Sequence, residues 1–251
     1  MPLLGTRDMT PLRQAAPIID KLDVEPLVLP GVDVLQATFE IDDAQLLEML
    51  PKSVHPTIPP IATFLFWRCP DGPLGPFNLA QVRVNCRAGF RSRGYLLGSY
   101  CNSEAAGTVL RNHWGFDCRS GAVTLDRYFD AIIGTVEAGG QENLRVSLMN
   151  PMILSGADVE MAGNFNLARI RTNGDERLKL VQVEPEYVIE RPDRGTPRLD
   201  VFVGDAWSAR ELVPEFPVTA LHFRAELRLP RVRYLVDPDL PLQDGTEYVG
   251  D

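Results

Sequence analysis

The polar residues with the clearest capacity for chemistry lie together in the segment LRNHWGFDCR, residues 110–119. His113 is a candidate general acid or base, because an unperturbed imidazole titrates near neutral pH. Cys118 is a candidate thiolate nucleophile if His113 or Arg119 lowers its pKa. Asp117 is a candidate acid, base or substrate-orienting group. Each also has a structural interpretation: a helix-end histidine, a small buried thiol and an aspartate–arginine salt bridge.

Lysine, the residue that forms Schiff bases with carbonyl substrates, is rare in this chain. Of 25 basic residues, three are lysines (Lys21, Lys52 and Lys179) and 22 are arginines. Lys21 falls in an N-terminal arm, and Lys52 follows a predicted helix, where solvent exposure is expected. Lys179 lies in a predicted strand and is interpreted as an ordinary strand residue. The sequence therefore argues against amine catalysis.

The elements that must position the 110–119 segment are mostly strands. Runs with strand-like composition, several alternating apolar and polar residues, recur along the chain at 32–41, 61–68, 79–87, 94–101, 122–137, 144–148, 164–172, 178–190, 198–203 and 218–229. Turn-forming sequences separate them at 70–76, 91–94, 137–141 and 172–176. Helical patterns are few. Asp42 or Asp43 can cap a helix through AQLLEML that stops at Pro51, and Ser103 can cap a second one that reaches about Asn112.

This pattern predicts one mainly β domain. Residues 1–25 show little periodicity and are interpreted as an N-terminal arm, followed by a single domain over residues 26–251. Many strands with two or three helices favour a β-barrel or sandwich with helical decoration.

Composition narrows the classes of partner. A net charge of −9 without a basic block argues against nucleic acid, whose phosphates need a clustered cationic surface. No apolar run is long enough to cross a bilayer, and the N-terminus lacks a signal-peptide pattern, so we expect a cytoplasmic protein without a membrane partner. The cysteines are widely spaced, which predicts neither disulfides nor a metal site; they are Cys69, Cys86, Cys101 and Cys118.

The 110–119 segment resembles the signature of the acetoacetate decarboxylases, which typically reads GREIWGFPKK. Arg111, Trp114, Gly115 and Phe116 occupy matching positions. Segments on either side resemble the family in the same order, among them IDDAQLLEMLP, CPDGPLGPFNLAQVRV, GYLLGSY and LRVSLMN, so that the resemblance covers roughly residues 25–237. It implies a closed, cone-shaped antiparallel β-barrel with peripheral helices around an apolar cavity, assembled as a homo-oligomer.

The chain departs from that family where the family's chemistry is done. The signature's PKK triplet is replaced by Asp117-Cys118-Arg119. Neither cysteine nor arginine forms a Schiff base, and arginine stays protonated. Schiff-base decarboxylation is therefore not expected.

The resemblance also maps the family's charged cavity groups onto apolar residues. Phe64 and Leu79 stand where the family has two glutamates, and Val32 stands near its carboxylate-contacting arginine. Such a pocket is expected to favour a larger or more neutral carbonyl compound than acetoacetate, because unpaired charge is costly there.

We therefore expect an enzyme that acts without a Schiff base, as an acid–base lyase, dehydratase, cyclase or isomerase, on an apolar carbonyl small molecule. The alternative is a non-catalytic small-molecule-binding β-barrel. No cofactor is implied. The catalytic candidates are Asp117, Arg119, His113 and Cys118. The substrate-binding candidates are Phe64, Leu79, Trp114 and Arg111, the last with a structural ion pair as its alternative.

Overall fold

Strands make up most of the chain in the computed structural model, which describes residues 3–172 and 174–250. The strands are β1 (Ile18–Ile19), β2 (Leu27–Glu40), β3 (His55–Pro56), β4 (Ile61–Cys69), β5 (Phe77–Ala88), β6 (Arg91–Cys101), β7 (Cys118–Ser120), β8 (Ala122–Arg127), β9 (Ala131–Ala138), β10 (Gln141–Ile153), β11 (Gly163–Thr172), β12 (Asp175–Val183), β13 (Glu186–Phe202), β14 (Phe216–Leu229), β15 (Tyr234–Val236) and β16 (Thr246–Tyr248). The α-helices are α1 (Asp43–Met49), α2 (Glu104–Trp114) and α3 (Leu242–Gly245). This confirms a mainly β protein.

Both predicted helix starts are confirmed. The Asp42 carboxylate accepts hydrogen bonds from the first-turn N–H groups of α1, at 2.8 and 3.3 Å. The Ser103 hydroxyl accepts one from Ala106 at the start of α2. These bonds satisfy N–H groups that have no partner within the helix. The second helix runs to Trp114 and ends on Gly115, in the left-handed conformation at φ 69°.

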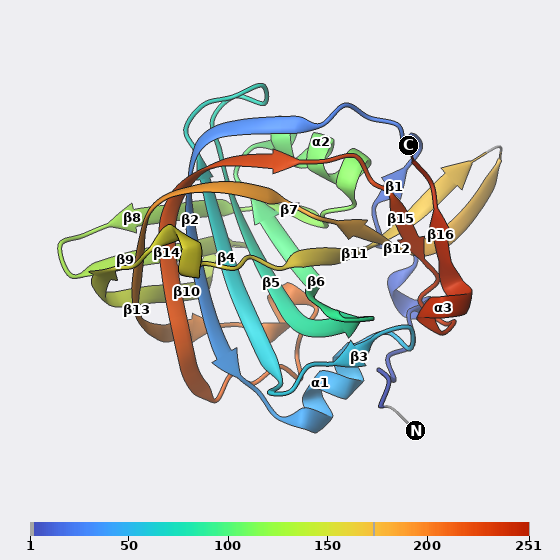
Figure 1. The fold of residues 1–251 in the computed structure, drawn as a ribbon, viewed down its shortest axis with the longest axis horizontal. Helices are drawn as coiled ribbons and strands as arrows, with labels where there is room; N and C mark the ends of the chain where they lie inside the picture. The colour runs from blue at the N-terminus through green and yellow to red at the C-terminus, as the bar shows by residue number, and fades with distance from the viewer. Residues whose placement is uncertain (1–2, 173, 251) are drawn as a thin grey trace.

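The strands form one mixed sheet that curls around the molecule (Figure 1). Its order is β16-β15-β12-β11-β6-β5-β4-β2-β14-β13-β10-β9-β8. Most neighbours are antiparallel, but β11 and β7 both pair with β6 in parallel. The second parallel pair arises because α2 carries the chain back before β7 begins. The expectation of a wholly antiparallel sheet is therefore wrong. No ladder joins β16 to β8 within the described residues, so closure into a barrel is not confirmed.

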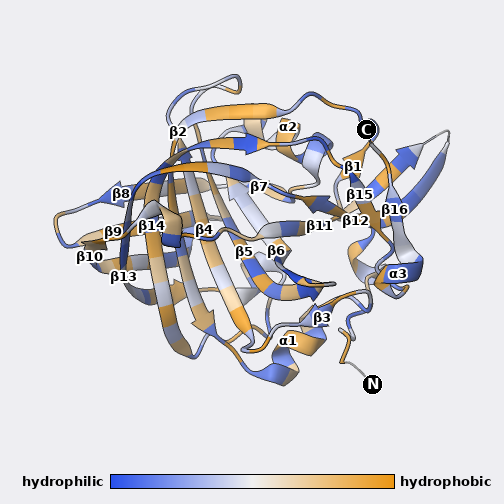
Figure 2. Ribbon diagram, in the orientation of Figure 1, coloured by the Kyte–Doolittle hydropathy of each residue, from blue (hydrophilic) through white to orange (hydrophobic). Residues whose placement is uncertain are grey.

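The strands β2, β4, β5 and β6 lie between two hydrophobic cores, one on each face. The strands β8, β9 and β10 cover one face and form the first core with it. Helix α2 and strands β11, β12 and β14 cover the other face and form the second core. Alternate residues of β4 enter different cores, Phe64 and Phe66 the first and Leu65 and Trp67 the second. Figure 2 accordingly shows β4 as mostly hydrophobic.

The N-terminal arm packs on its own domain. Met9 and Ile19 are fully buried. Ile18 and Ile19 form β1, which pairs in parallel with β11. The arm therefore covers the sheet beside α2 and forms part of the wall around the signature segment.

Gly115 provides a test of this packing. A Cβ at Gly115 would lie 3.1 Å from the Ala168 Cβ at φ +69°, whereas one at Gly139 would meet nothing within 4 Å at φ +64°. Both alanine variants carry backbone strain, but only Gly115→Ala overpacks the second core. We expect Gly139→Ala to lower the free energy of unfolding by about 1 kcal/mol, and Gly115→Ala by at least about 1 kcal/mol more. Urea unfolding measures both, and equal losses would contradict the packing described here.

Candidate functional site

Residues 117–119 alternate between two environments, as an extended segment should. Cys118 begins β7, which pairs with β6 opposite Ser99, and its side chain is 1% exposed in the second core. Asp117 and Arg119 turn the other way, where their side chains are about one-third exposed. The replaced signature thus places its thiol inside and its charged groups outside.

The thiol of Cys118 is a poor nucleophile in this position. Its Cβ lies under α2 at Gly107, and the Ser99 hydroxyl donates to Sγ at 3.7 Å. Burial, with a smaller contribution from Cys101, raises the pKa of Cys118 to about 12. Since the thiolate is the reactive form, Cys118 is a neutral packing residue at physiological pH.

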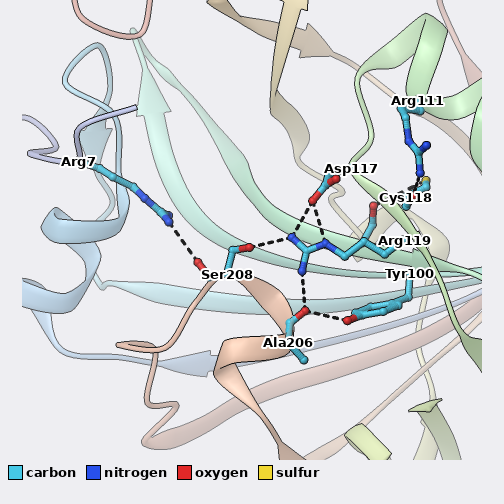
Figure 3. Close-up of polar contacts among 9 residues, drawn as sticks. Arg7, Tyr100, Arg111, Asp117, Cys118, Arg119, Ala206 and Ser208 are labelled. Carbon is cyan, nitrogen blue, oxygen red and sulfur yellow. Dashed lines mark hydrogen bonds and ion pairs between the residues drawn. The ribbon is translucent and has the colours of Figure 1, made fainter. Parts of the chain in front are cut away.

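Arg119 is the centre of a polar network on the outer side of the segment (Figure 3). Its guanidinium donates to the Asp117 carboxylate at 2.8 and 3.2 Å, to the Ala206 carbonyl at 2.6 Å and to the Ser208 hydroxyl at 2.8 Å. Arg7 donates to the Ser208 carbonyl from the N-terminal arm. The network joins the signature, the loop before β14 and the arm, which fits the salt-bridge interpretation of Asp117 and Arg119.

A small pocket of about 50 Å³ opens beside this network. Asp117, Arg119 and Arg7 contribute its charged wall, and Leu12, Ala15, Ala16 and Pro17 of the arm are among its apolar lining. Tyr95, Leu97 and Leu167 also line it, and these three residues pack in the first core. The pocket therefore lies on the side of the sheet to which Asp117 and Arg119 turn, away from the second core.

The remaining signature residues hold the segment in place. Arg111 donates to the Cys118 carbonyl, which attaches α2 to β7. The Trp114 indole N–H donates to the Pro230 carbonyl at 2.8 Å, and its ring is buried. His113 packs against Trp114, and burial together with nearby Lys21 lowers its pKa. These contacts support the structural alternatives for Arg111 and His113.

The two residues mapped onto the family's glutamates do not face one cavity. Phe64 lies in the first core, with its ring against Phe39 and Phe202 at 5.7 and 5.3 Å. Leu79 lies in the second core, on the same face as Cys118. The structure therefore does not bring Phe64 and Leu79 together. Phe64 lies on the opposite side of the sheet because the side chains of a strand alternate.

The second core contains a group of polar residues that the sequence reasoning missed. We call it the buried polar cluster: Trp67, Gln81, Arg83, Asn164, Asn166 and Tyr187. Its centre is a double hydrogen bond in β5, in which Arg83 Nε and a terminal guanidinium nitrogen donate to Gln81 Oε1 at 2.9 and 2.6 Å. Gly94 leaves room for Arg83, since a Cβ there would lie 2.7 Å from the Arg83 side chain. Gly94 lies inside β6, so the turn predicted at 91–94 is wrong: the turn lies at 89–90.

Arg83 is an unusual residue for an apolar core. Its side chain is almost completely buried, and none of the ion pairs of the described residues includes it. Burial lowers the pKa of Arg83 to about 10, which still leaves the guanidinium charged at neutral pH. A buried cation whose neighbours are neutral creates a strong positive potential in the second core.

Several atoms of the cluster are fully buried without a hydrogen-bond partner. They are Trp67 Nε1, Gln81 Nε2, Asn164 Oδ1 and the Tyr187 hydroxyl. Each such group costs about 1–3 kcal/mol when left unpaired. The Tyr187 hydroxyl lies beside the Trp67 indole and the Arg83 guanidinium, so Gln81 Nε2 and Asn164 Oδ1 are the two atoms whose partners are missing. The signal in the sequence was weak, because NLAQVRV and GNFNLAR alternate polar and apolar residues like strands with one solvated face.

Tyr187 contributes a phenol to the cluster, which can act as an acid. Its hydroxyl lies near the Arg83 guanidinium and the Trp67 indole, both of which favour the phenolate. Burial outweighs them and raises the pKa of Tyr187 to about 12, so the phenol keeps its proton at neutral pH. It can therefore donate a hydrogen bond or a proton to a ligand.

No lysine of the described residues belongs to this cluster. Lys179 is buried in β12 but donates to Asp237 at 3.2 Å and Glu247 at 2.7 Å. No group of three or more histidine, cysteine or acidic side chains in the described residues has a metal-binding arrangement. Within the same residues, no helix is long and apolar enough to span a bilayer.

A family model for acetoacetate decarboxylase matches residues 11–238. The chain belongs to the acetoacetate decarboxylase family. It shares that family's fold and the frame of its signature, while Cys118 stands at the first of the signature's two lysine positions. The comparison with curated proteins gave no match.

Solved structures of the family share the fold at low sequence identity. The acetoacetate decarboxylase from Legionella pneumophila is 19% identical, with a TM-score of 0.72 over 83% of this chain and 86% of that one. An acetoacetate decarboxylase-like enzyme from Sphingomonas wittichii RW1 is 16% identical, with a TM-score of 0.66 over 84% and 92%. The enduracididine biosynthesis enzyme MppR, in complex with the condensation product of pyruvate and imidazole 4-carboxaldehyde, is 14% identical, with a TM-score of 0.65 over 83% and 88%. At these identities the likeness establishes the fold alone.

Thiol reactivity tests whether Cys118 of this acetoacetate decarboxylase relative is a packing residue or a nucleophile. All four cysteines are buried, and burial raises the pKa of each thiol. We expect the native protein to show no fast reaction with Ellman's reagent near pH 8, and all four thiols to react after denaturation. A single fast native thiol mapped to Cys118 by mass spectrometry would restore the nucleophile hypothesis.

Proposed function

We propose that this protein is an acetoacetate decarboxylase-like enzyme that acts on a carbonyl small molecule without a Schiff base. In the proposal the ligand occupies the second core, beside the buried polar cluster. The observation that carries it is the unpaired donor Gln81 Nε2 next to the charged Arg83 and the protonated Tyr187 hydroxyl.

That arrangement supports electrostatic catalysis at a carbonyl group. When a proton is lost next to a ketone, or when a bond to its α-carbon breaks, negative charge develops on the carbonyl oxygen. Prearranged donors in a water-poor site stabilise such an oxyanion far more than they stabilise the neutral ketone. Arg83 supplies the positive potential and Tyr187 a proton at the same point. The cluster thus offers what the family's imine supplies elsewhere, a sink for developing charge.

Proton removal is assigned to the outer side of the signature. Asp117 is the carboxylate in the wall of the outer pocket, and Arg119 holds it by two hydrogen bonds. We propose Asp117 as the base or substrate-orienting group, with Arg119 as its positioning residue. Asp117 faces away from the second core in this structure, so the step requires the 117–119 segment to turn the carboxylate towards the ligand. His113 and Cys118 have lesser claims, because their contacts are those of packing residues. MppR, solved in complex with the condensation product of pyruvate and imidazole 4-carboxaldehyde, supports carbonyl-derived ligands in this fold.

The second candidate is a binding protein of the same fold without catalysis. It is favoured by one observation: the buried polar cluster contains neither a carboxylate nor an imidazole. The two candidates differ in Asp117, which only the enzyme needs near the ligand. Both include assembly as a homo-oligomer.

A matched pair of arginine variants tests the role of Arg83. Arg83→Met removes the buried charge, and we expect the free energy of unfolding to stay within about 1 kcal/mol of wild type, because lost hydrogen bonds are offset by relief of desolvation. Binding of 4-phenylbutan-2-one, a neutral apolar ketone, should weaken at least about tenfold by calorimetry.

The control for that experiment is Arg93→Met. Arg93 is also buried, but it pairs with Glu184 at 2.6 Å and lies over the Phe165 ring. Its loss should lower stability by about 1 kcal/mol and change ketone affinity little. Weakened binding in Arg93→Met alone would contradict the assignment.

Borohydride trapping tests the absence of amine chemistry. With acetoacetate or 4-phenylbutan-2-one present, reduction should leave the intact mass unchanged, because the described lysines lie away from the cluster or are held by carboxylates. Acetoacetate should also bind more weakly than the phenyl ketone. An adduct, on Lys179 above all, would show that an imine forms.

A further inference from the structure

Two side-chain amides of the buried polar cluster have orientations imposed by their neighbours. Gln81 Oε1 accepts two hydrogen bonds from Arg83 and one from Asn164 Nδ2, the last at 3.4 Å. Because Oε1 must face these donors, Nε2 faces away from them as a free donor. It is completely buried and has no partner.

Asn164 is oriented in the complementary sense. Asn166 Nδ2 donates to the Trp114 carbonyl at 2.8 Å, which turns Asn166 Oδ1 towards Asn164. Asn164 Nδ2 then donates to Asn166 Oδ1 at 3.5 Å and to Gln81. Its own Oδ1 is left as a free acceptor, also completely buried.

The free donor and the free acceptor belong to amides in direct contact. The Asn164 Nδ2 to Gln81 Oε1 distance is 3.4 Å, and the oxygen and nitrogen of one amide are separated by two short bonds. The two open atoms therefore lie within roughly 8 Å of each other, within reach of one small molecule. Gln81 Nε2 needs a hydrogen-bond acceptor on the ligand, whereas Asn164 Oδ1 needs a donor.

We propose that this pair recognises a β-hydroxy carbonyl compound, in which the carbonyl oxygen accepts from Gln81 Nε2 and the hydroxyl on the β-carbon donates to Asn164 Oδ1. The proposal rests on the proposed function and defines the substrate class of the same site. A simple ketone satisfies Gln81 but leaves the Asn164 oxygen unpaired. A carboxylate fails in the same way, because it has no donor. A ligand that carries both a carbonyl and a hydroxyl group satisfies both amides and suits the apolar surroundings.

Two probes that differ by one hydroxyl group test the idea. They are 4-hydroxy-4-phenylbutan-2-one and 4-phenylbutan-2-one, compared by calorimetry with the wild-type protein. The hydroxy ketone should bind about tenfold more tightly, the effect of one buried hydrogen bond to a group otherwise left unpaired. 3-Phenylpropanamide, which also carries an acceptor and a donor, is the third probe. Amide binding tighter than that of the hydroxy ketone would replace the proposed class.

Variants at Asn164 assign the effect. Asn164→Leu removes the acceptor, so the affinity ratio of the two ketones should fall to about one. Asn164→Asp keeps an acceptor and should retain the preference for the hydroxy ketone over the plain ketone. This variant also tests the proposal if Asn164→Leu does not fold. Asn143→Leu is the control, since Asn143 is equally buried but bonded to the Ala138 carbonyl in another part of the sheet. It should keep the wild-type ratio.

The outcomes separate this inference from the proposed function. If the plain ketone binds and the hydroxyl group adds nothing, the hydroxy-carbonyl class is wrong while the carbonyl site stands. If neither ketone binds, and a crystal structure shows only ordered water between Gln81 and Asn164, both fail. A preference that survives in Asn164→Leu would place the hydroxyl group elsewhere and overturn the assignment.

Discussion

The double hydrogen bond from Arg83 to Gln81 is the interaction on which the rest of the buried polar cluster depends. It fixes a cation in a hydrophobic core and turns the Gln81 amide so that its N–H groups are free. Asn164, Asn166 and the Trp114 carbonyl continue the same chain of orientations to the end of the signature helix. A core that keeps a charge and several unpaired polar atoms gives up stability, and sites that bind or react are where proteins do so.

This member of the acetoacetate decarboxylase family lacks the amine but keeps the structure around it. The frame of the signature is retained: the cap at Ser103, the left-handed Gly115 and the bond from Arg111 to β7 all remain. What changed is the side chain delivered by that frame, now a neutral thiol under α2. In the proposed function, Arg83, a buried cation on the same face of the sheet as Cys118, stabilises the charge that the family places on an imine.

Much of the fold could be predicted from sequence, because caps, alternation and the order of family-like segments are local signals. The starts of α1 and α2, the strand-rich domain and the inward Cys118 were predictable in this way. The parallel β6–β7 and β6–β11 pairs were not, since pairing between distant strands leaves no local trace. Gln81 and Arg83 were missed because polar residues at alternate positions indicate a solvated face, and only the tertiary structure shows that α2 and β11 cover it. Phe64 was misplaced for the related reason that one residue of register reverses the face.

The central claim is that the buried polar cluster holds the carbonyl oxygen of the ligand. A crystal structure of the protein with 4-phenylbutan-2-one tests it most directly. We expect the ketone oxygen to lie within hydrogen-bond distance of Gln81 Nε2 or Trp67 Nε1, on the Arg83 side of the second core. A ketone bound only in the outer pocket beside Arg119, or an imine to a lysine, would contradict it.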